Sequence, residues 1–509
     1  MTGDGGHVSV GINELVTNSI TSKLRRSGPH LRSARSCTIC KVPDRFHEMM
    51  ERSAYIPLEV SVGPYHRQKE SLKGEDGKLS FMLTLLTRKA NMKFGEEEEE
   101  TRGGNVVGVE EKEAEIEELV TANRIIQLGS SRMVGAPRGW LAVLKDCVAA
   151  IEKMETEIRE CYSNLIEMES EEFVEMMVVD GLFIIELLTE VNNKDLDPDN
   201  PLFASVTYAA ANLYWDILLL ENQLPIFALK ELFILTAADD KVGPGDDDFY
   251  RLILNYLRED EMGEAYIHHE DLARCKDGKH LLDIFSRELY PRLPSHVDQD
   301  DSVICSLYSG YCYEPKIQEP KSKLIIPGAV ELSRAGVLFK KRSSVEPHSF
   351  LDVKFNRNGI FEIPPLVIDD YTDRWLRNLI AFEQFRHNRY THMTAYAVLM
   401  DGLINSAKDV ELLRNKGILI SWLGSDEEVA NMFNKLCIEI LRYNSIYSEL
   451  YDEVNRYYMK RRHKWQATLK REYFNNPWSL CSFLAAVLLI LLTVTSTVFT
   501  ALAWVVPKP

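Results

Sequence analysis

The longest uninterrupted apolar stretch of the chain lies close to its C-terminal end. No charged side chain occurs between Leu480 and Val506, a run of about 27 residues that as a helix measures roughly 40 Å. A hydrocarbon core is about 30 Å thick, so this helix can cross it with some tilt. Trp478 and Trp504 bracket the run as interfacial anchors. The pattern predicts one transmembrane helix over residues 479–506, although a buried core helix is the alternative.

Basic residues on one side of this stretch predict its orientation. Only Lys508 follows it, whereas six basic residues precede it: Lys460, Arg461, Arg462, Lys464, Lys470 and Arg471. Basic residues beside a span stay in the cytoplasm, and Arg461, Arg462 and Lys464 are the expected anchors at that interface. Residues 1–36 contain no apolar core of a signal peptide, and the chain has no Asn-x-Ser/Thr sequon. We expect a tail-anchored, single-pass protein of the plasma membrane or an endomembrane, with its large part in the cytosol.

The remaining chain predicts a flexible tail over residues 1–36 and a large helical domain over 37–475. Five consecutive glutamates, Glu96–Glu100, begin an acidic stretch that predicts a flexible insertion over 95–118. A second acidic loop is expected over 237–250.

Helical periodicity is strongest after Pro137. One apolar stripe is predicted at Trp140, Leu141, Leu144, Val148, Ile151, Met154 and Ile158. The following stretch FVEMMVVDGLFIIELL is apolar on nearly all sides, which is typical of a helix enclosed by other helices. We expect Asp180 within it to need a buried partner.

The string LLLENQLP interrupts the next apolar run with polar residues. We expect a helix to end near Glu221 and Pro225 to occupy the first turn of the next helix. Asn222 and Gln223 then lie between the two helix ends, where they can bond free backbone groups. Glu221 with Asp180 or Asp216 could form a carboxylate pair for acid–base work, or these residues could lock a buried corner. No nucleophile or phosphate loop lies nearby, which favours the structural interpretation.

The pattern changes to alternation around residue 355. FLDVKFNRNGIFEIPPLVI alternates on both sides of Asn358-Gly359, which predicts a β-hairpin. Pro364 and Pro365 predict that its second strand is an edge strand. Further helices are predicted at 373–385, 395–417 and after Ser425, which is a good N-cap. The expected fold class is therefore mainly α, a large multi-helix globular domain with a small β-hairpin and one C-terminal transmembrane helix.

Composition and motifs narrow the function. The 509 residues carry a formal net charge of −18, which argues against nucleic acid as the main partner. The nine cysteines form no regular framework and suit a reducing compartment. The chain has no Gly-rich phosphate loop, Gly-x-Ser-x-Gly elbow or His-Glu-x-x-His helix. We therefore predict no catalytic, cofactor-binding or metal-binding residue, and no cofactor.

Ten ordered motifs carry a resemblance to a known family. They run from KVP and AYIPLEVSVGPYHR through RECYS, VVDGLFIIELL, LLLENQLPIFAL and HLLDIF to IPGAVELSRAGVLFK, LDVKFNRNGIFEIPPLVIDD, RNLIAFEQF and YFNNPWS. Over residues 40–506 the chain resembles the plant family catalogued as domain of unknown function 247. The resemblance implies a plant membrane protein with a helical domain and a C-terminal anchor. It assigns no catalytic residue, and some grass members of the family are associated with self-incompatibility.

Two classes of function remain at this point. The first is a membrane-anchored recognition or scaffolding protein with a protein partner. The second is a membrane-bound enzyme, such as a hydrolase, that uses the carboxylates named above. The anchor, the acidic loops and the absence of an assembled catalytic motif favour the first.

Overall fold

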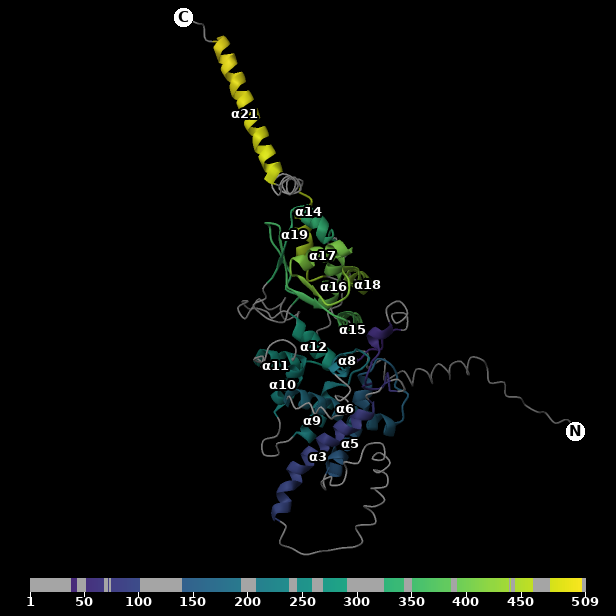
Figure 1. Ribbon diagram of the computed structural model, residues 1–509. Helices are drawn as coiled ribbons and strands as arrows, with labels where there is room; N and C mark the ends of the chain where they lie inside the picture. Colours follow the sequence, from purple (N-terminus) through teal and green to yellow (C-terminus); the bar gives the residue numbers. More distant parts are fainter. Residues whose placement is uncertain are drawn as a thin grey trace, which may run out of the picture. The chain divides into compact units, whose positions relative to one another are not determined.

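The chain folds into helices with two small sheets, and it divides into two compact units (Figure 1). The computed structural model describes residues 38–43, 52–67, 72, 75–100, 140–193, 207–237, 245–258, 269–290, 325–342, 350–385, 391–438, 440, 445–460 and 477–505. Unit 1 comprises Met1–Glu288 and Arg374–Arg386. Unit 2 comprises Leu289–Asp373 and His387–Pro509. The predicted tail over 1–36 lies outside the described residues.

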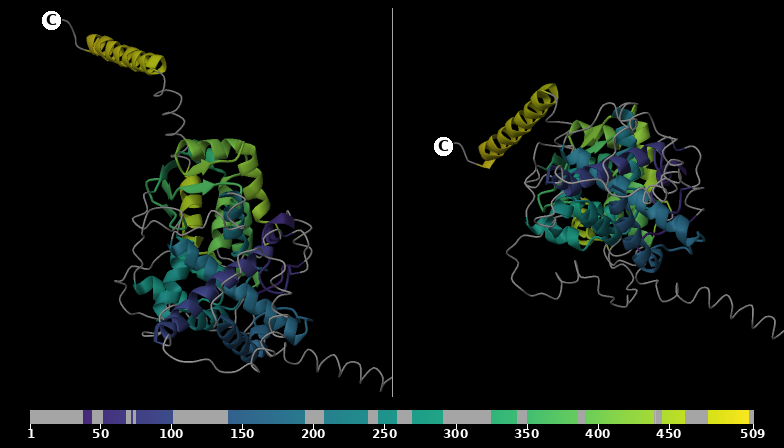
Figure 2. Two further views of the ribbon diagram at one scale, coloured as in Figure 1. Left: turned by 60° about the horizontal axis from the view of Figure 1, so that its bottom comes forward. Right: turned by 90° about the horizontal axis from the view of Figure 1, so that it is seen from below.

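Unit 1 is built from helices around one central helix. Its elements are η1 (Arg52–Tyr55), α3 (Glu75–Glu100), α5 (Trp140–Glu160), α6 (Ser170–Asn193), α8 (Thr207–Asp216), α9 (Ile226–Thr236), α10 (Asp246–Leu257), α11 (His269–Lys276), α12 (Leu281–Leu289) and most of α15 (Thr372–Phe385). Helix α6 packs against α3, α5, α9 and α10, which confirms that this apolar helix is enclosed. Figure 2 shows α3, α5 and α6, coloured purple to blue, packed together in both views.

The close approach of α6 and α9 depends on one glycine. A Cβ at Gly181 would lie 2.3 Å from Leu232 Cδ1 of α9. A Cβ atom there would force the buried Leu232 side chain to move, so a larger residue at position 181 would disturb this contact between the two helices.

Three predictions in unit 1 need correction. Helix α5 forms as predicted, but its buried face runs through Val143, Cys147, Ile151 and Ile158, and Val148 is exposed. Helix α3 continues to Glu100, so the first six residues of the predicted insertion over 95–118 are helical and the rest lies outside the described residues. The acidic loop ends earlier than expected because α10 begins at Asp246, where three aspartates favour a helix N-terminus.

Unit 2 combines two small sheets with helices. Its elements are α14 (Ala329–Arg334), β1 (Leu338–Lys341), β2 (Lys354–Phe355), β3 (Ile360–Ile363), β4 (Leu366–Ile368), α16 (His392–Leu403), α17 (Ala407–Asn415), β5 (Leu419–Ser421), α18 (Asp426–Leu436), α19 (Ser448–Tyr458) and α21 (Pro477–Val505). The first sheet has the strand order β1-β3-β2, and the second consists of parallel β4 and β5.

The predicted hairpin is confirmed, with one error. Strands β2 and β3 pair antiparallel with Phe355 opposite Phe361, and Gly359 takes a φ of 79° in the turn between them. Gly359 is favoured there because side chains rarely adopt positive φ. The second strand is not an edge strand, because β1 pairs with β3 in parallel on its other side. Pro364 and Pro365 instead end β3 before β4 begins.

The predicted helix over 395–417 is also two helices. The helix is interrupted between α16 and α17, and Ser406 and Asp409 form a capping box at the start of α17. Ser425 caps α18 as predicted, since its hydroxyl accepts the backbone N–H of Glu428 at 3.2 Å.

A buried polar network as the candidate functional site

Most of the site residues predicted within the helical domain meet in unit 1. Asp180 comes from α6, and Glu221, Asn222 and Gln223 lie between α8 and α9. The prediction that Pro225 occupies the first turn of α9 is wrong: with a ψ of 134° Pro225 is the extended N-cap residue, and α9 begins at Ile226. The four polar residues are buried, and so is Asp216 at the end of α8. Helix α8 ends at Asp216 and not near Glu221, so the residues from Ile217 to Gln223 form an irregular corner.

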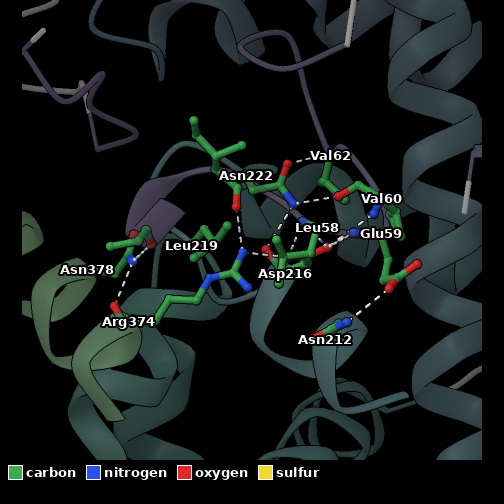
Figure 3. A network of polar contacts seen from close by, with 12 residues as sticks. Leu58, Glu59, Val60, Val62, Asn212, Asp216, Leu219, Asn222, Arg374 and Asn378 are labelled. Atoms are coloured by element: carbon green, nitrogen blue, oxygen red, sulfur yellow. Dashed lines mark hydrogen bonds and ion pairs between the residues drawn. The ribbon is translucent and has the colours of Figure 1, made fainter. Parts of the chain in front are cut away.

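The network holds one irregular segment of backbone, residues 56–63. This segment forms neither helix nor strand, so its N–H and C=O groups need other partners. Asp216 is the partner of three N–H groups: its carboxylate accepts those of Leu58 at 2.9 Å, Glu59 at 2.7 Å and Val60 at 3.1 Å (Figure 3). One buried carboxylate therefore satisfies three consecutive backbone donors.

Helix α15 brings the counter-charge to Asp216. One guanidinium nitrogen of Arg374 donates hydrogen bonds to Asp216 Oδ1 at 2.7 Å and to the carbonyl of Ile56 at 2.7 Å. Burial raises the pKa of Asp216, although Arg374 and the three backbone N–H groups act in the opposite direction. One turn further along α15, Asn378 accepts the N–H of Leu220 at 2.9 Å and donates to the carbonyl of Ala54 at 2.8 Å.

Asn222 uses its whole side-chain amide inside the network. Its Oδ1 accepts the N–H of Val62 at 2.6 Å. Its Nδ2 donates to the carbonyl of Val60 at 3.1 Å and to the carbonyl of Asp216 at 2.9 Å (Figure 3). Asn222 thus joins the end of α8 to the irregular segment, as its position between helix ends predicted.

Gln223 bonds both sides of the corner in the same manner. Its Nε2 donates to the carbonyls of Ile217 at 2.7 Å and Leu219 at 2.8 Å. Its Oε1 accepts the N–H of Leu282 at 3.0 Å, in the first turn of α12. The Gln223 side chain is therefore the hydrogen-bond partner of two carbonyls in the corner and of a backbone N–H in the first turn of α12, which has no partner within its own helix.

Asp180 has the buried partner that its position in an apolar helix predicted. Lys78 of α3 lies 2.7 Å from Asp180 Oδ1 and also donates to the carbonyl of Ser61. Asp180 Oδ2 accepts the N–H of Gly63 at 2.9 Å. Gly63 has a φ of 73°, and a Cβ there would lie 3.0 Å from the carbonyl oxygen of Gln223, so the segment passes the corner at a glycine.

Glu221 binds a second piece of the N-terminal part of the chain. Its Oε1 accepts the N–H of Val42 at 2.7 Å, and its Oε2 lies 3.0 Å from Nε2 of the buried His66. Asp180 and Asp216 therefore bind the same segment, residues 56–63, at different positions, whereas Glu221 binds the backbone at Val42. The described residues contain no group of three or more His, Cys, Asp or Glu side chains that could hold a metal ion.

Arg374, Asn378 and Lys78 are network residues that the sequence reasoning did not single out. The signal for Arg374 and Asn378 was present, because both are polar positions on the buried face of an amphipathic helix. Lys78 carried no such signal, because it lies before the apolar part of α3.

The predicted membrane-interface residues lie at the C-terminal end of the chain. Trp478 and Trp504 lie within α21, near its two ends. Arg461, Arg462 and Lys464 lie outside the described residues. Helix α21 contains a stretch, Cys481–Ala501, that is long and apolar enough to cross a membrane, and none of this stretch is buried in the structure.

Comparison with known proteins identifies the family to which the chain belongs. It is 26% identical to the UPF0481 protein At3g47200 of Arabidopsis thaliana over 93% of this chain and 88% of that protein. It is 27% identical to the putative UPF0481 protein At3g02645 of the same plant, over 68% of this chain and 77% of that protein. No solved structure matches the chain significantly. The sequence profile of family DUF247, described as a plant protein of unknown function, matches residues 39–492, and the chain belongs to this family.

Proposed function

We propose that this protein is anchored in a plant membrane by α21 and that its large part binds a protein partner, as a recognition or scaffolding protein. One observation supports the proposal of a membrane anchor: the stretch Cys481–Ala501 is helical, apolar and exposed. Its threonine hydroxyls bond back to their own helix, as Thr493 does to the carbonyl of Leu489 at 2.7 Å and Thr497 to that of Thr493 at 2.7 Å. A helix in hydrocarbon needs its polar groups satisfied internally.

Extraction of membranes at alkaline pH tests the anchor. The full chain should remain in the membrane pellet after carbonate washing, because water does not solvate an apolar span of this length. A shortened form that ends at Arg471 should move to the supernatant. Recovery of the full chain in the wash would contradict the anchor.

The polar network supports a structural task for the candidate carboxylates. A general acid or base must come within hydrogen-bond reach of a substrate. Asp180, Asp216 and Glu221 are at most 2% exposed, and each accepts at least one backbone N–H. The alternative function, a membrane-bound hydrolase that uses these carboxylates, would require them to open to solvent. We therefore propose that the protein is not an enzyme.

Acidic segments are the proposed binding elements. Loops on a rigid scaffold commonly carry specificity, and the sequence places acidic runs at Gly95–Gly108 and Ala237–Asp248. Residues 95–100 of the first run are the end of α3. The end of the second run is held to the fold at the start of α10, where Asp246 pairs with Lys230 at 2.5 Å and Asp247 with Lys276 at 2.6 Å. The partner surface should be basic, and the association should weaken as salt increases.

Proximity labelling in plant cells tests the binding proposal. The full chain would be compared with a variant in which Glu96–Glu100 are changed to Gln and residues 101–108 and 238–244 are replaced by Gly/Ser sequence of equal length, so that Asp246 and Asp247 keep their ion pairs. A matched control replaces residues 343–349, which carry one acidic residue. A labelled partner lost only from the first variant supports the proposal, and an unchanged set of partners contradicts the assignment to these segments.

A further inference from the structure

The end of unit 2 around Tyr457 gathers three pieces of chain. The Tyr457 hydroxyl donates to the carbonyl of Gly336, just after α14, at 3.3 Å. Its ring lies so close to the β2–β3 turn that a Cβ at Gly359 would be 2.4 Å from it. The C-terminal ends of α14 and α19 and the β2–β3 turn are therefore neighbours, and Figure 1 shows α14 and α19 together.

Four exposed basic side chains surround this point. Arg334 ends α14, Arg357 lies in the β2–β3 turn, and Arg456 and Lys460 flank Tyr457 along the chain. None of the four forms an ion pair within the part of the chain that the structure describes. Glu331, the acidic residue of α14, accepts the hydroxyl of Tyr458. That hydrogen bond leaves the negative charge of Glu331 in place, so the four unpaired basic side chains outweigh this carboxylate in a chain of net charge −18.

Exposed apolar side chains lie among the basic ones. Met459 is 74% exposed, Ile325 is 69% exposed and Leu338 is 53% exposed. Asn455, one turn before Met459, donates to the carbonyl of Ile325 at 3.0 Å, and the N–H of Leu338 donates to the carbonyl of Gly359 at 2.8 Å. We call the four basic and three apolar side chains the Tyr457 face. Mixed basic and apolar surfaces of this kind bind at the headgroup level of a bilayer.

The chain continues from the Tyr457 face to the apolar helix. Helix α19 ends at Tyr458 and α21 begins at Pro477, and a fully extended connection of that length spans at most about 65 Å. The intervening sequence is itself basic, with Arg461, Arg462, Lys464, Lys470 and Arg471 against Glu472. A tether of this length keeps the face near the bilayer at a high effective concentration, so a weak attraction is sufficient.

The size of the face favours a lipid surface over a protein. Three exposed aliphatic or thioether side chains offer at most a few hundred Å² of apolar area, whereas each partner in a standard protein interface contributes roughly 800 Å². Basic side chains near a bilayer need no such area, because anionic headgroups attract each of them.

We propose that the Tyr457 face binds the anionic headgroups of the membrane that α21 enters. The proposal rests on the membrane anchor proposed above and adds a fixed contact between unit 2 and the lipid surface. The arginines pair with headgroup phosphates and carboxylates, while Met459, Ile325 and Leu338 enter the boundary between headgroups and acyl chains.

Hydroxyl-radical footprinting of the full chain in nanodiscs tests this proposal. Discs of phosphatidylcholine alone would be compared with discs that also contain phosphatidylserine, and oxidation would be located by mass spectrometry. Oxidation of Met459 should fall several-fold on the anionic discs, because lipid covers its sulfur. Trp422, which is 78% exposed after β5, should be oxidised equally on both kinds of disc.

Two matched variants separate charge recognition from other effects. Changing Arg334, Arg357 and Arg456 to Gln should remove the protection of Met459. Changing three exposed lysines elsewhere on unit 2 to Gln should leave it intact, and these are Lys408, Lys416 and Lys435. The proposal is wrong if the α21 peptides are protected but Met459 is oxidised to the same extent on the two kinds of disc, whether that extent is high or low. Unprotected α21 peptides would instead show that the anchor itself has failed.

Discussion

Asn222 illustrates at the scale of one residue why the LLLENQLP motif is polar inside an apolar run. A side-chain amide has one acceptor and two donors, and here they bond one backbone N–H and two carbonyls inside the protein. A hydrophobic residue of similar size would leave three buried backbone groups without partners. Such groups cost about 1–3 kcal/mol each when left unsatisfied, which exceeds any gain from added apolar burial.

Asn222→Ala should therefore destabilise unit 1 by about 2–4 kcal/mol, because water replaces the lost amide only in part. Urea unfolding of the full chain in detergent would measure the change in free energy of unfolding. Asn255→Ala is the control, since its hydrogen bond to Asn192 is exposed and should contribute less than about 0.5 kcal/mol. Unchanged stability together with loss of a defined activity would favour a catalytic role for the network.

His392 provides a prediction for the dependence of stability on pH. Burial lowers the pKa of His392 to about 4, below its ordinary value of 6.5, and its ring stacks on Tyr290 with centroids 4.2 Å apart. Above pH 6.5 the folded and unfolded chains both carry neutral His392. As pH falls from 6.5 to 4 the unfolded chain binds the proton first, so unit 2 loses up to about 3 kcal/mol of stability.

The variant His392→Phe keeps a ring on Tyr290 and removes the titrating group. Its free energy of unfolding should fall less than that of the unchanged chain over this pH range. Replacing the exposed His269 by Phe should not alter the slope. Equal slopes for the chain and for His392→Phe would show that His392 does not couple folding to pH.

The partners of the network show how far sequence reasoning reaches at the scale of residues. Polar residues within an apolar run predicted that Asp180, Asn222 and Gln223 are buried and hydrogen-bonded, because buried polar groups need hydrogen-bond partners. The same logic could not pair Asp216 with Arg374, which lie 158 positions apart. Periodicity reports which face of a helix is buried, but it carries no information about which distant helix covers that face.

Elements were predicted best where their signal is local. The β2–β3 hairpin followed from an Asn-Gly turn between alternating strands, and its turn geometry has the expected positive φ at Gly359. The parallel pairing of β1 with β3 was missed because it joins segments that no turn connects. For the same reason Pro364 and Pro365 predict an edge strand from the sequence, whereas in the structure they only end β3.

Packing between elements gives a further prediction at Gly181 and Gly402, two glycines inside helices. Gly181→Ala should destabilise unit 1 by about 1–3 kcal/mol, because its Cβ would overlap Leu232 of α9 and force this buried side chain out of its present position. Gly402→Ala is the matched control: its Cβ would meet Ile326 at 3.4 Å, an ordinary contact. The control should be neutral or stabilising by up to about 1 kcal/mol, since alanine favours helix. Equal effects in thermal unfolding would contradict the close α6–α9 contact.

At the scale of the whole molecule, polarity is divided along the chain. Unit 1 buries the ion pairs Lys78–Asp180 and Arg374–Asp216 in its interior. Unit 2 has unpaired basic side chains at the end from which the chain continues toward α21. A buried network gives unit 1 a single arrangement of its N-terminal segment, and an exposed basic end gives unit 2 a means of meeting an anionic surface.

Orientation in the membrane is the last prediction, and it follows from the same charge distribution. The basic stretch before α21 should remain on the cytoplasmic side, which places unit 1 and the part of unit 2 that precedes α21 in the cytosol. The chain has no glycosylation sequon, so an Asn-x-Thr tag joined by a spacer to either end reports its own compartment. In microsomes, a tag after Pro509 should acquire a glycan and a tag before Met1 should not. The two tagged forms control each other, because each orientation glycosylates one of them. A glycan on the N-terminal tag alone would mean that the folded units face the lumen and that the basic stretch does not set the topology.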